Sequence, residues 1–173
     1  MTATPRKYTG LHEGYARGRR PGTDFLANGI TWLTAGKLWN NGTYGIRPNH
    51  SNMAIPSVHA TGRAADISMR AVAPHPGADR KYLTQWIDLM VKYADELGLE
   101  MIIDYGYAPD GRIWMCDRNG WQDCPPGYVN GGGWGDWIHI EIDPEHANSV
   151  ALIQKAFDLM VPKPKKTAAA KKA

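Results

Sequence analysis

The sequence predicts an α+β domain in which a small antiparallel sheet is flanked by helices. One amphipathic helix is indicated over residues 80–97, where apolar residues recur at three- and four-residue steps. Residues 137–142 alternate between isoleucine and other side chains, and such one-faced strands are typical of antiparallel sheets. Shorter strands are indicated at 99–104 and 112–116. The length of 173 residues fits one domain.

The remaining elements follow from turn and cap residues. Residues 1–56 are rich in Gly, Pro, Asn and Thr, so we expect loops with only short elements there. The helix over 80–97 is expected to end at Gly98, where a left-handed residue can terminate it. Asp143 and Pro144 have the types of an N-cap and a first helical residue. The helix that follows is expected to bury the stripe Val150, Ile153, Phe157 and Met160.

Charge is distributed unevenly along the chain. The net charge is +3, but five lysines lie in the last segment, and without them residues 1–162 carry −2. Because a Lys/Ala/Pro segment cannot bury a core, we predict a folded domain over 1–162 and a disordered tail over 163–173. The near-neutral domain argues against specific nucleic-acid binding.

The sequence also indicates where the chain is made. The N-terminus is charged without an apolar segment behind it, and no window approaches the roughly 18 apolar residues of a membrane span. We therefore expect a protein made in the cytoplasm without a signal peptide. We also expect a monomer. Cys116 and Cys124 are compatible with a disulfide, half a metal site or two free thiols, and the reduced form is the expected one in the cytosol. The absence of a second cysteine pair excludes a four-thiolate zinc site.

The segment 57–66, SVHATGRAAD, contains the first candidate metal ligands. His59 and Asp66 are residue types that bind zinc. Gly62 permits a tight turn between them, so that both side chains can reach one point. On its own this pair is weak evidence, because a lone histidine is more often a structural residue than a metal ligand.

The segment 135–141, GDWIHIE, contains a third candidate ligand. On a strand, His139 faces away from the isoleucines and shares its face with Glu141. A histidine beside a carboxylate suits a functional site, although an ordinary solvent-facing strand would show the same alternation.

Together, His59, Asp66 and His139 are predicted to form the ligand set of a catalytic zinc site for one Zn²⁺ ion. Three protein ligands leave a fourth position for water, whereas structural zinc sites are closed by four. A further carboxylate must then accept the proton of the water, and Asp136 and Glu141 are the candidates. The sequence thus predicts that the sheet carries the zinc site.

Both segments match a known family. The pattern Ser-x-His-x-x-Gly-x-Ala-x-Asp resembles the zinc-ligand signature of the D-Ala-D-Ala carboxypeptidase and L-Ala-D-Glu peptidase family, within the lysostaphin-type, D-Ala-D-Ala and hedgehog-like metallopeptidases. That family includes vancomycin-resistance dipeptidases and many phage endolysins. Its second motif, an acidic residue three positions before the last zinc histidine, is similar to Asp136 and His139, with Trp137 between them. The fixed positions of the first motif are filled by Ser57, His59, Gly62, Ala64 and Asp66.

The resemblance implies a zinc-dependent peptidase that hydrolyses an amide bond in the peptidoglycan stem peptide. It implies that His59, Asp66 and His139 hold the metal, and that Ser57 orients the first ligand by a hydrogen bond. A phage endolysin with L-Ala-D-Glu or related endopeptidase activity is the expected setting, since such a protein acts on the wall once the membrane is permeabilised. The alternatives are a D-Ala-D-Ala carboxypeptidase or dipeptidase, and a non-catalytic zinc-containing wall-binding module.

Two criteria disagree about the general base. The family spacing favours Asp136, although much of the family has Glu there. Strand parity favours Glu141, because it shares the face of His139 and Asp136 does not. A bulge at 135–136 would re-aim the aspartate. On the family spacing, we expect Asp136 to be the general base, with Glu141 as the runner-up.

The resemblance also implies substrate-binding residues. The family places an arginine upstream of the first motif to hold a substrate carboxylate or an oxyanion; Arg47 is the candidate and Arg63 the alternative. The glycine-rich run 128–134 is expected to form a flap over the cleft or a hairpin loop. Trp134 and Trp137 are expected to contact the stem peptide.

Overall fold

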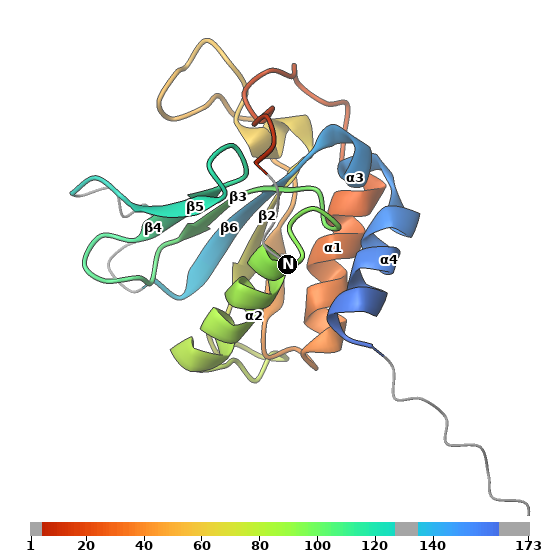
Figure 1. The fold of residues 1–173 in the computed structure, drawn as a ribbon, viewed down its shortest axis with the longest axis vertical. Coiled ribbons are helices and arrows are strands. Elements are labelled where there is room, and N and C mark those ends of the chain that lie inside the picture. The colour runs from red at the N-terminus through yellow and green to blue at the C-terminus, as the bar shows by residue number, and fades with distance from the viewer. Residues whose placement is uncertain (1–4, 127–134, 163–173) are drawn as a thin grey trace, which may run out of the picture.

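The computed structural model describes residues 5–126 and 135–162 and confirms the α+β class (Figure 1). Its centre is a six-stranded sheet with the order β1-β2-β6-β3-β4-β5, in which all neighbouring strands are antiparallel. The central strand β6 therefore lies between β2 and β3. The strands are β1 (Trp39–Gly42), β2 (Ala64–Ser68), β3 (Leu99–Asp104), β4 (Arg112–Met115), β5 (Gly120–Asp123) and β6 (Trp137–Ile142).

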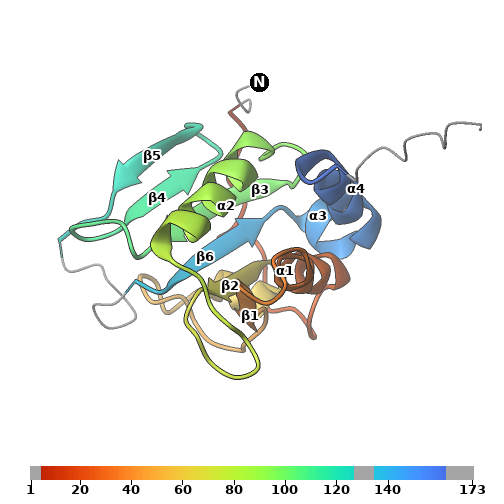
Figure 2. The ribbon, with the colours of Figure 1, turned by 90° about the horizontal axis from the view of Figure 1, so that it is seen from below.

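Helices cover one face of this sheet. Figure 2 shows α2 crossing in front of β3 and β6, with α1, α3 and α4 gathered beside it. Within the described residues, none of the helices has the length and apolar character needed to cross a bilayer. The helices are α1 (Pro21–Leu33), α2 (Arg80–Lys92), α3 (Pro144–Asn148) and α4 (Val150–Met160).

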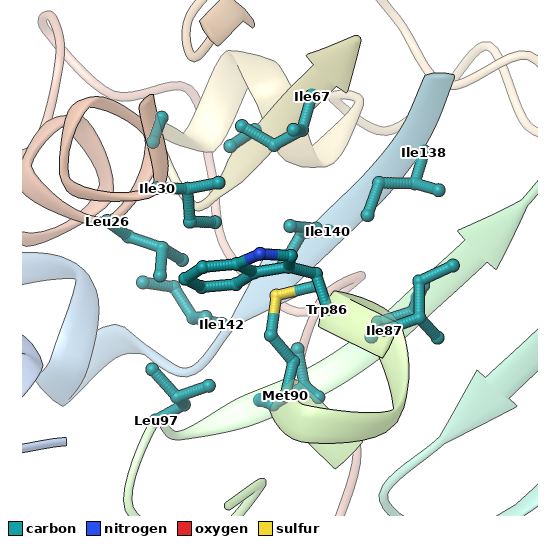
Figure 3. Packing of buried hydrophobic residues seen from close by; sticks show 14 of the residues in the cluster. Leu26, Ile30, Ile67, Trp86, Ile87, Met90, Leu97, Ile138, Ile140 and Ile142 are labelled. Atoms are coloured by element: carbon teal, nitrogen blue, oxygen red, sulfur yellow. The ribbon is translucent and has the colours of Figure 1, made fainter. Parts of the chain in front are cut away.

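The hydrophobic core lies between the helices and the sheet. The three isoleucines of β6 point into it, as the alternation of residues 137–142 predicts (Figure 3). Trp86 and Met90 of α2 pack against them from the helical side. This burial fixes the orientation of β6, because a strand with its isoleucines on the helical face must present its other residues on the opposite face.

The helix α2 ends earlier than its apolar pattern predicts. The predicted range was 80–97, but the regular helix stops at Lys92. The Ala94 N–H bonds to the Val91 carbonyl three residues back, which tightens the chain into successive turns. Gly98 has the predicted left-handed conformation, with φ at 60°. The apolar pattern continued past the helix because the turns still bury their apolar residues.

The helix α1 is a correction to the expectation of loops over residues 1–56. The two glycines of α1 lower the helix propensity of this segment, so the sequence pattern does not indicate a helix there. A Cβ on Gly22 would lie 1.9 Å from the His146 carbonyl oxygen, and one on Gly29 would lie 2.3 Å from the Phe157 ring. The glycines therefore let α1 pack closely on the C-terminal helices, and tertiary packing outweighs their poor propensity.

The C-terminal region is helical as predicted, but in two pieces. The Asp143 side chain accepts a hydrogen bond from a backbone N–H of the first turn, and Pro144 is the first helical residue, which confirms both assignments. Ser149 then separates α3 from α4 and caps the latter. In α4 the predicted stripe is wrong at one position: Val150 is 41% exposed, and Ala156 is buried instead.

The two cysteines are free and buried. Burial raises the pKa of the Cys116 thiol to about 11 and also raises the pKa of the Cys124 thiol. Both thiols therefore stay protonated near neutral pH, and no disulfide joins them.

Candidate metal centre

A short 3₁₀ turn, η1 (Val58–Thr61), presents the first candidate ligand, His59. The Ser57 hydroxyl oxygen accepts a hydrogen bond from the Ala60 N–H and caps this turn. Gly62 ends it in the left-handed conformation, with φ at 75°, and turns the chain into β2, as predicted from its residue type. Ser57 therefore holds His59 by stabilising its turn, and no hydrogen bond from its side chain to a ligand is found in the described part of the chain.

The other two candidate ligands lie side by side on neighbouring strands. Asp66 of β2 and His139 of β6 are direct partners in the antiparallel register. Directly opposed residues share one face of a sheet. Both side chains therefore lie on the face away from the helices, where η1 brings His59 to meet them.

The three donor atoms form a compact triangle. Asp66 Oδ1 lies 3.0 Å from His139 Nδ1 and 3.2 Å from His59 Nε2, and the two histidine nitrogens are 3.2 Å apart. Donors bound at 2.0–2.1 Å by a tetrahedral metal lie about 3.3 Å from one another. The His59, Asp66 and His139 side chains, which are only 6%, 16% and 12% exposed, can therefore hold a metal ion on one triangular face of its coordination sphere.

Glu141 supports the metal centre from behind His139. Its Oε1 lies 2.9 Å from His139 Nε2, and its Oε2 accepts a hydrogen bond of 2.7 Å from the Tyr8 hydroxyl. Because a carboxylate can only accept, His139 Nε2 donates its proton to Glu141, so Nδ1, the atom that faces Asp66, is the ring nitrogen whose lone pair a metal ion would use in place of a proton. Glu141 thus contacts the side of the imidazole opposite to the metal-facing atom.

The electrostatic environment of His59, Asp66 and His139, called the triad below, favours a positive charge among the three side chains. Burial alone would raise the pKa of Asp66, but hydrogen bonds from His139 and His59 outweigh it and hold this pKa below its usual range. Burial would lower the pKa of His139, yet the carboxylates of Asp66 and Glu141 raise it to about 9. A metal cation satisfies the same carboxylate and replaces the proton on the ring, so the donor set fits a divalent ion.

Asp136 lies just before β6, outside the group formed by His59, Asp66 and His139. Its carboxylate is 3.5 Å from the Arg70 Nε, and both side chains are partly exposed. The preceding Gly135 has φ at 50° and packs so tightly that a Cβ would lie 2.2 Å from the Cα of Gly106. A turn anchored on Gly106, rather than a bulge within β6, therefore sets the direction of Asp136.

The two arginine candidates for substrate binding differ in their exposure to solvent. Arg47 is exposed, and its backbone carbonyl accepts a hydrogen bond from the Ser57 N–H. Arg63 is fully buried and forms ion pairs with Glu100 at 3.2 Å and with Glu13 at 3.3 Å. A buried guanidinium with these partners cannot meet a substrate, so the alternative assignment of Arg63 is wrong and its role is structural.

Aromatic residues lie beside the ligands on the same face. Trp137 is two positions before His139 on β6, and its ring packs on Tyr105 with centroids 4.3 Å apart. Arg70 was not among the site residues predicted from the sequence. The central carbon of its guanidinium lies 5.8 Å from the centre of the Trp39 ring. Trp134 and the run 128–134 fall outside the described residues, so the flap remains an expectation.

No protein-family model, curated protein or solved structure matches this chain. The donor triangle is therefore the main observation from which a function can be proposed. A cavity of about 330 Å³ opens beside the start of α2, among Lys37, Lys81 and Tyr82, but none of the three metal-binding residues lines it.

Proposed function

We propose that this chain is a zinc-dependent peptidase that hydrolyses an amide bond in the peptidoglycan stem peptide. The observation that carries the proposal is the group of three convergent donors from His59, Asp66 and His139. A site with three protein ligands keeps a fourth position for water or substrate, which is typical of catalytic zinc. The substrate class is supported by the resemblance of segments 57–66 and 136–139 to the D-Ala-D-Ala carboxypeptidase and L-Ala-D-Glu peptidase family.

The chemistry divides between the metal and the side chains around it. Zinc held by such a ligand set polarises a carbonyl and lowers the pKa of a water ligand toward about 7. Asp136 accepts the proton of the attacking water on its carboxylate and returns it to the leaving amine. Of the two base candidates Asp136 is the better one, because both carboxylate oxygens of Glu141 are occupied by His139 and Tyr8.

We assign substrate binding to residues on the face of the sheet away from the helices, called the open face below. The Trp137 and Tyr105 rings offer an apolar surface beside the ligands. Arg47 is exposed in the loop that leads to η1 and can approach a substrate carboxylate. A phage endolysin that reaches the wall after the membrane is permeabilised is the setting that we propose.

The test is to digest purified peptidoglycan with the zinc-loaded protein and identify each new amino terminus by mass spectrometry. A new amine on D-Glu shows L-Ala-D-Glu cleavage, whereas release of D-Ala shows carboxypeptidase activity. The matched control is His139→Ala, which removes one ligand from the triad. Binding to the wall without any cleavage by the folded, zinc-loaded protein would refute the peptidase and leave a wall-binding module.

A further inference from the structure

The segment of residues 6–10 crosses the open face of the sheet like a strap. In Figure 1 it is drawn in red on the side opposite α2. At one end, the Arg6 N–H donates to the Cys116 carbonyl at 2.8 Å. At the other end, the Thr9 hydroxyl donates to Glu100 at 2.7 Å, and the Thr9 N–H donates to the same oxygen at 3.2 Å. The strap is therefore fixed on both sides of Tyr8.

The anchor under Thr9 is a buried ion pair. Arg63 is fully buried, Glu100 is 1% exposed, and the two side chains are 3.2 Å apart. Arg63 also donates a hydrogen bond of 2.8 Å to the Thr9 hydroxyl oxygen. Removing one member would leave a buried charge without its partner, which is strongly unfavourable. The strap thus has little freedom to leave the sheet.

Tyr8 connects this strap to a metal ligand. Its hydroxyl donates to Glu141 Oε2, and the other oxygen of Glu141 accepts from His139 Nε2. The chain of contacts ends at His139 Nδ1, 3.0 Å from Asp66. Gly10 leaves space for the contact between Tyr8 and Glu141, because a Cβ at this position would lie 2.3 Å from the Tyr8 hydroxyl and 2.8 Å from Glu141.

We infer that Tyr8 is a positioning residue of the metal centre, which acts through Glu141 to hold His139 with Nδ1 toward the ion. The hydroxyl fixes the carboxylate, and the carboxylate fixes both the tautomer and the ring orientation of the histidine. Outer partners of this kind typically change metal affinity by 10- to 100-fold when they are lost. The inference rests on the metal-binding half of the proposed function and is independent of the substrate.

The first test is Tyr8→Phe, with the zinc dissociation constant measured by competition with a chelator and the melting temperature measured without metal. We expect zinc affinity to fall about tenfold, the low end of that range, because Tyr8 acts one contact further out. The matched control is Tyr44→Phe. It removes a tyrosine hydroxyl that donates a hydrogen bond of 2.8 Å to the carbonyl of Ala16, which lies after the strap in the N-terminal part of the chain. The control should bind zinc like the wild type. Unchanged affinity in Tyr8→Phe, with or without a lower melting temperature, would overturn the inference.

A double-mutant cycle with Glu141→Ala tests whether Tyr8 acts through the glutamate. Once Glu141 is gone, Tyr8→Phe should change zinc affinity no further, because the connecting carboxylate is missing. Full additivity of the two changes would contradict the proposed route. Gly10→Ala supplies an independent disturbance of the same contact and should also weaken zinc binding. If the wild type binds zinc but cleaves no peptidoglycan, the proposed function fails while this inference stands; a wild type that binds no zinc overturns both.

Discussion

The two faces of β6 are covered in different ways. On one face, Ile138, Ile140 and Ile142 are at most 1% exposed beneath the helices. On the other face, His139 and Glu141 lie beneath the N-terminal strap and η1, among carboxylates, hydroxyls and a buried guanidinium. One strand therefore separates an apolar layer from a polar one.

The difference matters because the two layers are held together by different physics. Apolar burial is non-directional, so the helical face stabilises the fold without fixing any one atom closely. The polar layer depends on hydrogen bonds with defined partners, and each lost partner leaves a buried group unsatisfied. We therefore expect changes on the helical face to alter stability, and changes on the open face to alter metal binding and catalysis.

The largest effect is expected from removing a metal ligand. His139→Ala or His59→Ala should abolish peptidoglycan cleavage and reduce zinc from about one ion per chain to a trace, because two donors hold the ion poorly. The fold should survive, since the helical face is untouched. Zinc content, cleavage and circular dichroism are the measurements. Full activity of a metal-free wild type would contradict the metal centre.

The next effect concerns the base. Asp136→Asn should lower turnover on a defined stem peptide by about 100- to 10,000-fold and leave zinc bound, because the amide keeps the shape but cannot accept the proton. Glu141→Gln should keep most of its turnover, since its amide oxygen can still accept from His139. Zinc content is checked for each variant. A dead Glu141→Gln beside a nearly normal Asp136→Asn would show that strand parity was the better guide.

A change on the helical face should have the opposite character. Ile140→Ala should lower the free energy of unfolding by about 2–5 kcal/mol, because it leaves a cavity under α2. The zinc dissociation constant of the molecules that remain folded should stay unchanged. Denaturant titration gives the first quantity and chelator competition the second. A parallel loss of zinc affinity would show that the two layers are coupled.

Zinc itself should stabilise the fold by a smaller amount. An ion that binds only the folded state adds about 2.7 kcal/mol at a free concentration 100 times its dissociation constant. The melting temperature should rise with zinc in the wild type. His139→Ala, which lacks a ligand, should show little or no rise. An equal rise in both proteins would place the stabilising zinc elsewhere.

Much of the fold could be predicted wherever a strong pattern was present. The alternation of residues 137–142 and the run 99–104 became β6 and β3 with the predicted bounds. The helix α1 could not be predicted, because Gly22 and Gly29 owe their positions to contacts with α3 and α4. Such contacts join residues more than a hundred positions apart, which local periodicity does not report.

The site shows the same limit. The group of His59, Asp66 and His139 was predicted from two short motifs and the family that they resemble, and the structure brings the three side chains together in a group that could hold a metal ion. The contact from Tyr8 to Glu141 spans 133 positions and leaves no local signal. The structural role of Arg63 was missed for the same reason, since its partner Glu100 lies 37 positions away, on β3.

The smallest effect is expected from the C-terminal segment. Deleting residues 163–173 removes five lysines, and the buried core that the described residues form runs from Leu26 to Met160. The melting temperature and the zinc dissociation constant should therefore not change, because a Lys/Ala/Pro segment has little apolar surface to bury. Adsorption to anionic wall polymers should weaken, most visibly at low salt, where unscreened lysines attract most strongly. Scanning calorimetry and wall-binding assays across a salt series measure the two quantities. A large drop in melting temperature would show that the segment packs on one of the two faces.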